Sequence, residues 1–298
     1  MYCLILIEKP LKIKNTLLLL LVFSFSCASV FSQQGKVDPT FNTYDDGLLG
    51  DGFDNTVRTL SVQDDGKLIV GGDFLNFNGV ATPYLCRLLP DGSKDASFFL
   101  GTGFNNKVYT SLLQPDGKIL VAGSFTQFNG TAVGRLVRLN PDGSRDSSFT
   151  ASPGATNSII YNMVLQSDGS IFLVGSFTSF NGTAANRIVK ILPNGAVDTS
   201  FVTGSGASGL IEKIALQSDG KIIIGGGFEE FNGSTVGKIA RLNADGTLDA
   251  SFITGVGFDN NVSAIGIQSD GKIILGGSFT TFNGTAANRI LRINTDGT

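Results

Sequence analysis

The chain of 298 residues has 22 basic and 25 acidic side chains, a net charge of −3, and no histidine or tryptophan. This mild acidity, without a block of basic residues, argues against nucleic acid as a partner. The absence of histidine excludes Ser-His-Asp and Cys-His catalysis and histidine metal sites, and we expect no metal and no cofactor.

Residues 1–32 have the pattern of a secretory signal peptide. Lys12 and Lys14 precede an apolar run at 17–25, and small and polar residues follow it. An N-terminal membrane anchor is the alternative, but the run is shorter than the roughly 18 residues that a spanning helix needs. We therefore expect cleavage after residue 32 and secretion to the periplasm or the cell surface. The mature domain, residues 33–298, should then have no stable membrane insertion.

The mature domain keeps a single cysteine. Cys3 and Cys27 leave with the signal peptide, so Cys86 remains alone. One thiol cannot form an intramolecular disulfide, and stability must come from the core. Cys86 aligns with Val137 and Val189 of later repeats, which predicts a core strand residue.

Beyond the signal peptide the sequence repeats itself five times, with a period of about 51 residues. Successive Asp-Gly turns place their glycines 51, 52, 51 and 51 residues apart, and a second Asp/Asn-Gly series keeps the same step. A fixed period of this length is typical of solenoids, propellers and repeat arrays. The repeats span residues 53–98, 104–149, 157–201, 209–252 and 260–298.

The second repeat, 104–149, shows what one unit builds. Its pattern predicts strands at 108–114, 118–125, 135–139 and 144–149, joined by Pro-Asp-Gly turns and by one loop. The second strand is apolar on both faces, so both of its faces must be covered. Short antiparallel strands covered by neighbours of the same kind predict an all-β fold, a β-propeller of four-stranded antiparallel blades. A β-solenoid is the alternative.

The turn geometry predicts one set of charge pairs. If Asn140 and Ser144 close the Pro-Asp-Gly hairpin, Arg138 faces Asp146. Opposite charges that face each other stabilise a strand pair by roughly 0.2–1 kcal/mol. The same eight-residue offset predicts four structural ion pairs: Arg87–Asp95, Arg138–Asp146, Lys190–Asp198 and Arg241–Asp249.

Residues 37–41, Val-Asp-Pro-Thr-Phe, match the last strand of a repeat but have no repeat before them. Propellers commonly close when an N-terminal strand completes the last blade. One hypothesis is therefore that 37–41 is a closing strand for the blade that begins at Val262, with Asp38 facing Arg292. The other is that the chain is truncated and that further blades follow. The sequence leaves both open.

Two segments of the chain carry a resemblance to a known family. Residues 268–285, QSDGKIILGGSFTTFNGT, and residues 241–252, RLNADGTLDASF, resemble the delta-60 repeat family of bacterial β-propeller repeat proteins. The resemblance extends over 37–298, because both half-motifs recur in order. It implies an exported bacterial protein, and it offers no catalytic residues to carry over.

Functional residues are expected where the repeats differ. All three glutamates of the mature domain, Glu212, Glu229 and Glu230, lie in the fourth repeat. Carboxylates bind hard cations or act as an acid/base pair in glycoside hydrolysis, although an ordinary solvated loop is the favoured interpretation of these three. Tyr109 and Tyr161 also break the pattern and would contribute to a binding face if they lie exposed at the blade ends.

These observations favour an exported, non-enzymatic β-propeller that acts at the cell surface as a binding or structural module. Its partner would be a protein or a glycan. The alternative is a carboxylate-based polysaccharide hydrolase or lyase that uses one of the three glutamates. A third hypothesis is a passive spacer within a longer surface protein.

Overall fold

The structure, a computed structural model, describes residues 38–43, 51–151, 153–155 and 157–298. The predicted signal peptide and residue 37 lie outside the described residues. The chain divides into a short unit that ends at Asp38 and a second unit, Pro39–Thr298, that contains all five repeats. The described part of the chain contains no apolar helix of the length that a membrane span requires.

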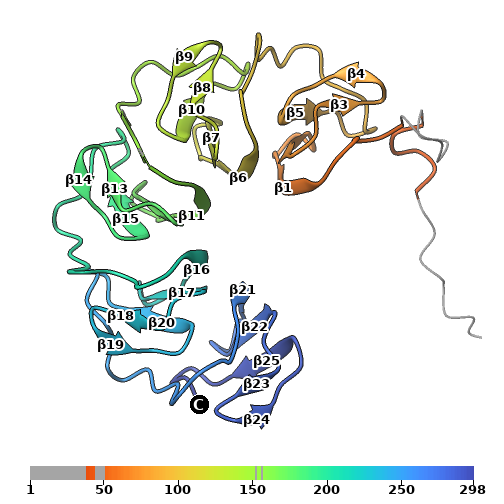
Figure 1. Ribbon diagram of the computed structural model, residues 1–298. Helices are drawn as coiled ribbons and strands as arrows, with labels where there is room; N and C mark the ends of the chain where they lie inside the picture. Colours follow the sequence, from red (N-terminus) through yellow and green to blue (C-terminus); the bar gives the residue numbers. More distant parts are fainter. Residues whose placement is uncertain (1–37, 44–50, 152, 156) are drawn as a thin grey trace, which may run out of the picture. The chain divides into compact units, whose positions relative to one another are not determined.

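Each repeat forms one blade, a three-stranded antiparallel sheet whose second strand lies in the middle (Figure 1). The first strand of each blade contacts the first strand of the next blade and faces the centre of the arc (Figure 1). The innermost strands are β1 (Val57–Val62), β6 (Val108–Leu113), β11 (Ile160–Leu165), β16 (Ile211–Leu216) and β21 (Val262–Ile267). The central strands are β2 (Leu68–Gly72), β7 (Ile119–Gly123), β12 (Ile171–Gly175), β17 (Ile222–Gly226) and β22 (Ile273–Gly277). The outer strands are β5 (Leu85–Leu88), β10 (Leu136–Leu139), β15 (Ile188–Ile191), β20 (Ile239–Leu242) and β25 (Ile290–Ile293).

The all-β class, the repeat period and the propeller blades are confirmed. The β-solenoid alternative is wrong, because the strands of each repeat pair antiparallel with one another inside one blade.

The predicted loop between the second and third strands contains a short hairpin, in which Asn129 and Gly130 both have positive φ, 48° and 70°. Two successive positive φ angles define the type I′ turn that Asn-Gly favours. The five hairpins are β3 (Asn76–Phe77) with β4 (Val80–Ala81), β8 (Gln127–Phe128) with β9 (Thr131–Ala132), β13 (Ser179–Phe180) with β14 (Thr183–Ala184), β18 (Glu230–Phe231) with β19 (Ser234–Thr235), and β23 (Thr281–Phe282) with β24 (Thr285–Ala286).

The fourth element of a blade is shorter than the sequence predicts. In the second blade it consists of one antiparallel bridge, Leu139 to Arg145, which keeps the predicted register. Beyond the bridge, the Asp146 carboxylate accepts hydrogen bonds from the backbone N–H of Ser148 at 2.9 Å and from its hydroxyl at 2.6 Å. This local turn competes with strand pairing. The segment 144–149 therefore leaves the sheet after one bridge.

The core lies between the blades. The cluster that joins the first two blades contains Ile69, Leu85 and Phe98 from the first blade, together with Val108 and Phe125 from the second. Three further clusters join the later blades in the same way. One phenylalanine per blade, after the central strand, is fully buried: Phe74, Phe125, Phe177, Phe228 and Phe279.

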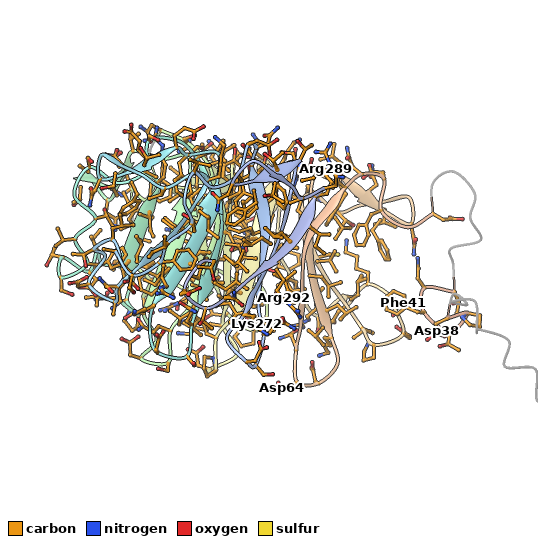
Figure 2. The ribbon with its side chains drawn as sticks, turned by 90° about the horizontal axis from the view of Figure 1, so that it is seen from below. Asp38, Phe41, Asp64, Lys272, Arg289 and Arg292 are labelled. Atoms are coloured by element: carbon orange, nitrogen blue, oxygen red, sulfur yellow. The ribbon has the colours of Figure 1, made fainter. Side chains whose placement is uncertain are left out.

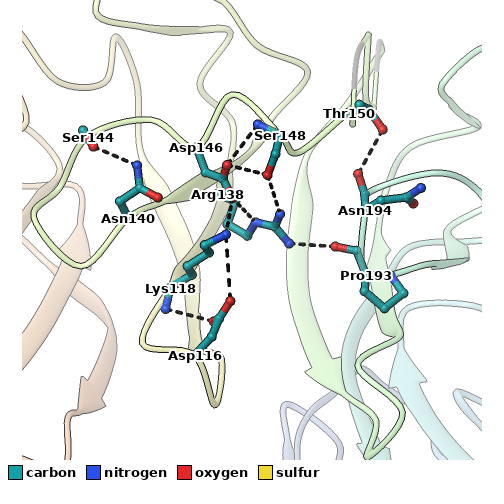
Figure 3. A network of polar contacts seen from close by, with 10 residues as sticks. All are labelled: Asp116, Lys118, Arg138, Asn140, Ser144, Asp146, Ser148, Thr150, Pro193 and Asn194. Atoms are coloured by element: carbon teal, nitrogen blue, oxygen red, sulfur yellow. Dashed lines mark hydrogen bonds and ion pairs between the residues drawn. The ribbon is translucent and has the colours of Figure 1, made fainter.

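An arginine on the outer strand connects each of three blades to the next one. Figure 3 shows the connection that Arg138 makes. Arg138 donates through Nε to Asp146 at 2.7 Å and through Nη1 to the carbonyl of Pro193 in the following blade at 2.7 Å. Its guanidinium lies 4.6 Å from the ring centre of Phe149. The four ion pairs that the register predicts are present in the structure, at 2.8, 2.7, 3.1 and 2.7 Å for Arg87–Asp95, Arg138–Asp146, Lys190–Asp198 and Arg241–Asp249.

No closing strand completes the fifth blade in the described residues. Pro39 and Thr40 form a turn, Phe41 follows in a bend, and Asn42 donates its N–H to the carbonyl of Asp91 in the first blade at 2.8 Å. Phe41 is 41% exposed, whereas its counterpart Phe98 is 7% exposed. Figure 2 shows Phe41 beside the first blade and Arg292 on the fifth. Residue 37 of the predicted strand lies outside the described residues.

Candidate functional site

Every innermost strand contains a β-bulge at its second residue. In the first blade Val57 pairs with Gly72 and Thr59 pairs with Gly71, so Arg58 has no partner in the ladder. A bulge redirects the side chain of its extra residue and commonly lies next to a functional site. The five bulge residues, at equivalent positions of the five blades, are Arg58, Tyr109, Tyr161, Glu212 and Ser263.

A glycine at the end of each central strand makes room for the bulge. A Cβ atom on Gly72 would lie 2.1 Å from the carbonyl oxygen of Thr56, and one on Gly123 would lie 2.2 Å from that of Lys107. Real Cβ atoms do not approach a carbonyl oxygen this closely, because packed atoms resist overlap. The same contact recurs at Gly175, Gly226 and Gly277.

The five bulge residues converge on one cavity of about 370 Å³ at the start of the innermost strands, which we call the bulge cavity. Its volume lies within the range of about 300–1,000 Å³ that is typical of ligand pockets. Its wall consists of the five bulge residues and four neighbours, Thr56, Val57, Leu210 and Lys213.

On one side of the bulge cavity a buried carboxylate holds two cations. Arg58 donates to both oxygens of Asp73, at 2.5 and 2.7 Å, and Lys107 donates to it at 2.9 Å. Asp73 is 8% exposed. The hydrogen bonds from Arg58 lower the pKa of Asp73 and raise the pKa of Arg58. Two cations on one carboxylate leave this side with one net positive charge.

Two tyrosines form the next part of the wall. The Arg58 guanidinium lies 4.6 Å from the ring centre of Tyr109, within the range of a cation–π contact. The rings of Tyr109 and Tyr161 meet edge to face, with their centres 5.2 Å apart. Burial raises the pKa of the Tyr161 phenol. The phenol therefore stays protonated at neutral pH and can donate a hydrogen bond.

A carboxylate lies further round the wall. Asn261, at the start of the fifth blade, donates to Glu212 Oε1 at 2.8 Å. Lys213 follows Glu212 in the wall. The bulge cavity thus combines a guanidinium, two phenols, a carboxylate, an ammonium group and a hydroxyl.

The opposite ends of the innermost strands are uniform. Two cavities there, of about 500 and 570 Å³, are lined by residues of the Gln-x-Asp-Gly turn that every repeat shares. One glutamine per blade contributes, and its side-chain oxygen is buried in each case: Gln63, Gln114, Gln166, Gln217 and Gln268. The repeats therefore agree at this end, in contrast to the varied bulge residues at the other.

Three of the five predicted binding residues line the bulge cavity, namely Tyr109, Tyr161 and Glu212. The other two do not. Glu230 begins strand β18 of the outer hairpin, and Glu229 precedes it with its side chain 67% exposed and paired with Lys238. Among the described residues, no group of three or more acidic or cysteine side chains is placed to hold a metal ion.

The sequence interpretation missed Arg58, Ser263 and Asp73. Aligning the five repeats could have identified this position. The residues equivalent to Arg58 are of four different kinds, whereas those equivalent to its neighbour Val57 are only valine and isoleucine. Asp73 replaces a serine or glycine of the other repeats.

Another cavity, of about 460 Å³, lies against the outer strand of the first blade and includes Cys86 and Arg87. The fourth blade has a similar cavity around Ala240 and Arg241. Burial raises the pKa of the Cys86 thiol to about 12, so the thiol is protonated at neutral pH. The recurrence of this cavity assigns it to the scaffold.

Five segments of the chain match the sequence profile of a family described as "Domain of unknown function (DUF5122) beta-propeller". Together they cover more than half of the chain: 63–98, 114–149, 166–201, 217–252 and 268–298. This supports the β-propeller repeat class that the resemblance implies, under a different family name. No curated protein matches the sequence. The matched segments begin after the innermost strands, so every bulge residue lies outside them.

Several solved structures are similar in fold. The WD40 β-propeller domain of Doa1 aligns with a TM-score of 0.52 and 18% identity, over 81% of this chain and 64% of that one. A protein of unknown function from Bacteroides caccae aligns with a TM-score of 0.45 and 14% identity, over 81% and 79%. The extracellular domain of a putative one component system from B. thetaiotaomicron aligns with a TM-score of 0.48 and 17% identity, over 76% of this chain and 26% of that one. At 18% identity, the likeness to the Doa1 domain concerns the fold alone.

Proposed function

Because the chain belongs to the DUF5122 beta-propeller family, whose description names no activity, we propose its function from the bulge residues, which the family profile leaves out. We propose that this propeller is an exported, non-enzymatic binding module and that the bulge cavity holds the end of a glycan. One observation carries the proposal. The five blades, alike in their scaffold, place different side chains at the same bulge position, and all five line one cavity.

The chemistry of the wall suits a sugar. A sugar ring has apolar C–H faces, which pack on aromatic rings, and hydroxyl groups, which need donors and acceptors. Tyr109 and Tyr161 supply the rings, while Arg58 and Glu212 supply a donor and an acceptor. Partly buried polar groups that are already held by neighbours lose little conformational entropy when a ligand binds. Asp73 holds Arg58, and Asn261 holds Glu212.

The size of the cavity favours a glycan end over a protein surface. A specific protein interface buries about 800 Å² on each partner, which needs a broad face. A cavity of about 370 Å³ instead admits one or two sugar units. The signal-peptide pattern of residues 1–32 supports a location outside the cytoplasm, where glycans of the cell surface are accessible. Cleavage after residue 32, read by N-terminal sequencing of the exported protein, tests that location.

The binding test measures how substitutions in the wall of the bulge cavity change the affinity for a glycan, with a matched substitution outside the cavity as the control. We expect a glycan array to identify a ligand, and titration calorimetry to show that Tyr161→Ala and Glu212→Gln each weaken its binding by tenfold or more. Glu230→Gln is the matched control, because it makes the same chemical change on the exposed outer hairpin. Equal binding by the Glu212→Gln and Glu230→Gln variants would contradict the proposal.

The same variants address the enzymatic alternative. A polysaccharide hydrolase or lyase would release reducing ends or unsaturated products from its substrate, and Glu212→Gln would abolish the turnover. Turnover that depends on Glu212 would replace the proposal. Binding of a protein partner that is insensitive to changes at Tyr161 and Glu212, with no glycan bound, would also overturn it.

A further inference from the structure

Three ionised side chains meet beside the bulge cavity, at the junction of the first and second blades. Arg58 is the bulge residue of the first blade, Asp73 follows its central strand, and Lys107 precedes the innermost strand of the second blade. The later repeats have serine or glycine at the position of Asp73. At the position of Lys107 the other repeats have threonine, isoleucine, leucine and asparagine. The chain thus departs from its own repeat at three residues that contact one another.

The later junctions between blades are built without such a group. Each has an uncharged residue at both positions: Ser124 and Ile159, Ser176 and Leu210, and Gly227 and Asn261. Apolar clusters join those blades. Since three junctions pack without a charge at these positions, joining two blades does not account for the charges at the first.

The carboxylate of this group lies behind its two cations. The Asp73 side chain is 6% exposed, whereas that of Arg58 is 32% exposed and that of Lys107 is 43% exposed. Arg58 is part of the cavity wall, and Asp73 is not. A molecule that enters the bulge cavity therefore meets the guanidinium and not the carboxylate that holds it.

Arg58 keeps hydrogen-bond donors for a ligand. A guanidinium has five N–H groups. Arg58 donates to Asp73 through Nε and through Nη2, and its Nη1 has no hydrogen-bond partner among the described residues. We call the edge formed by Nη1 and the second N–H of Nη2 the free edge. The contact with the Tyr109 ring and the two bonds to Asp73 hold the guanidinium in place, and an arginine edge of this kind binds an oxyanion through two parallel hydrogen bonds.

The bulge cavity has a net positive charge, although the chain as a whole has a net charge of −3. The ionised residues of its wall are Arg58, Glu212 and Lys213, and Arg58 brings its partners Asp73 and Lys107. Together they make three cations against two carboxylates. Lys213 takes part in none of the ion pairs of the described residues. A concave site of one sign concentrates ligands of the opposite sign, so this cavity favours an anion.

We propose that the sugar held in the bulge cavity carries an anionic group, a carboxylate or a sulfate, which accepts hydrogen bonds from the free edge of Arg58. This inference rests on the proposed glycan-binding function and narrows its ligand to acidic glycans. The sugar ring packs on Tyr109 and Tyr161, Lys213 adds a second positive charge, and Glu212 accepts from a sugar hydroxyl. A neutral sugar would leave the excess positive charge of the cavity without a counterion.

Titration calorimetry on the full chain tests the charge of the ligand. The probes are two series of oligosaccharides, which end in glucose or in galactose, each in its neutral form, its uronate form and its 6-sulfate form. We expect the better acidic form of at least one series to bind tenfold or more tightly than its neutral form. This advantage should shrink as sodium chloride is raised from about 0.05 to 0.5 M, because salt screens charges. The preference between uronate and sulfate identifies the anionic group, and inorganic sulfate alone should bind far more weakly.

Arg58→Gln tests the residue that carries the inference. In this variant Lys107 still pairs with Asp73, so no buried carboxylate is left without a cation. We expect the affinity for the acidic sugar to fall at least tenfold and the affinity for the neutral sugar to change less than threefold. Lys213→Gln should also lower the acidic preference, without touching Asp73. Lys272→Gln is the matched control, because it makes the same change at an exposed lysine beside the Asp-Gly turn of the fifth blade. Circular dichroism checks the fold of each variant.

The outcomes separate this inference from the function on which it rests. Equal affinity for neutral and acidic sugars, or an equal loss of both in the Arg58→Gln variant, would overturn the inference and leave glycan binding in place. Inorganic sulfate that binds as tightly as the sulfated sugar would also overturn it, because the tyrosines would then contribute nothing. If no sugar of either kind bound, the proposed function would fail and the inference with it.

Discussion

The arginine that connects neighbouring blades offers a sharp test of what stabilises the propeller. We predict that Arg138→Lys destabilises the chain although it keeps the charge. Arg138 donates to Asp146, to the Pro193 carbonyl of the next blade and to Ser148, at 2.7, 2.7 and 3.3 Å. The third blade provides the comparison, because it already has lysine, Lys190, at this position.

The magnitude follows from the contacts that a lysine loses. A lysine retains the ion pair, as Lys190 does with Asp198 at 3.1 Å. It loses the hydrogen bond to the following blade and the one to Ser148, each worth about 0.5–1.5 kcal/mol. It also loses part of the stacking on Phe149, worth about 0.5–1 kcal/mol. The expected loss is therefore about 1.5–4 kcal/mol.

The third blade also suggests how the loss can be offset. There Phe172 occupies the position of Leu120, and its ring lies 5.6 Å from the Lys190 ammonium and 5.1 Å from the Phe201 ring. We expect Leu120→Phe to restore part of the stability of the Arg138→Lys variant, because the larger ring fills the space that the guanidinium leaves.

Urea unfolding of the wild type, both single variants and the double variant forms a double-mutant cycle. Equal unfolding midpoints for the wild type and Arg138→Lys would refute the role of the connection. A double variant no more stable than Arg138→Lys would refute the compensation.

Three further predictions concern the scaffold. Gly123→Ala should cost about 1–3 kcal/mol or more, because its Cβ meets the Lys107 carbonyl, while Gly266→Ala, with nothing within 4 Å, should cost little in the same urea assay. Stability should be lost as the pH falls from about 4 towards 2. Burial alone would raise the pKa of Asp95, but hydrogen bonds from Ser97 and Arg87 hold it at about 2, below the unfolded value of about 3.9, so this group stabilises the fold only above that range. Thermal melts at pH 2–7 measure this loss. Finally, Cys86, 2% exposed and with a pKa of about 12, should react with a thiol reagent only after unfolding.

The scaffold can be predicted from the sequence because each of its features depends on residues that lie close together in the chain. A Pro-Asp-Gly turn determines the hairpin register, and the register places Arg138 opposite Asp146, as the structure has it. The length of the fourth element was not predicted correctly, because Asp146 and Ser148 form a turn that competes with strand pairing. The alternation of apolar and polar residues does not show which of the two conformations is more stable. The same local rules do not show whether the fifth blade is completed, since that depends on contacts between distant segments.

Only part of the candidate site could be predicted from the sequence, because variation between the repeats does not show where in the blade a residue lies. Glu212, Glu229 and Glu230 all differ from the residues at the equivalent positions of the other repeats. This difference does not show whether a residue lies on the innermost strand or on the outer hairpin. Only Glu212 is a bulge residue. Arg58 and Ser263 also vary between the repeats, and the bulge then shows that their position in the repeat turns towards the cavity.

The bulge also explains how one chain can keep a uniform scaffold and a varied site. A residue that pairs in the ladder and packs between blades, such as Val108 or Ile160, is restricted to branched apolar side chains. The next residue along, Tyr109 or Tyr161, takes no part in the ladder and is only half buried, so its replacement leaves the strand pairing unchanged. The glycine opposite, such as Gly123, maintains this separation. Substitutions at Tyr109 or Tyr161 should therefore alter ligand binding at little cost in stability, whereas substitutions at that glycine should affect both.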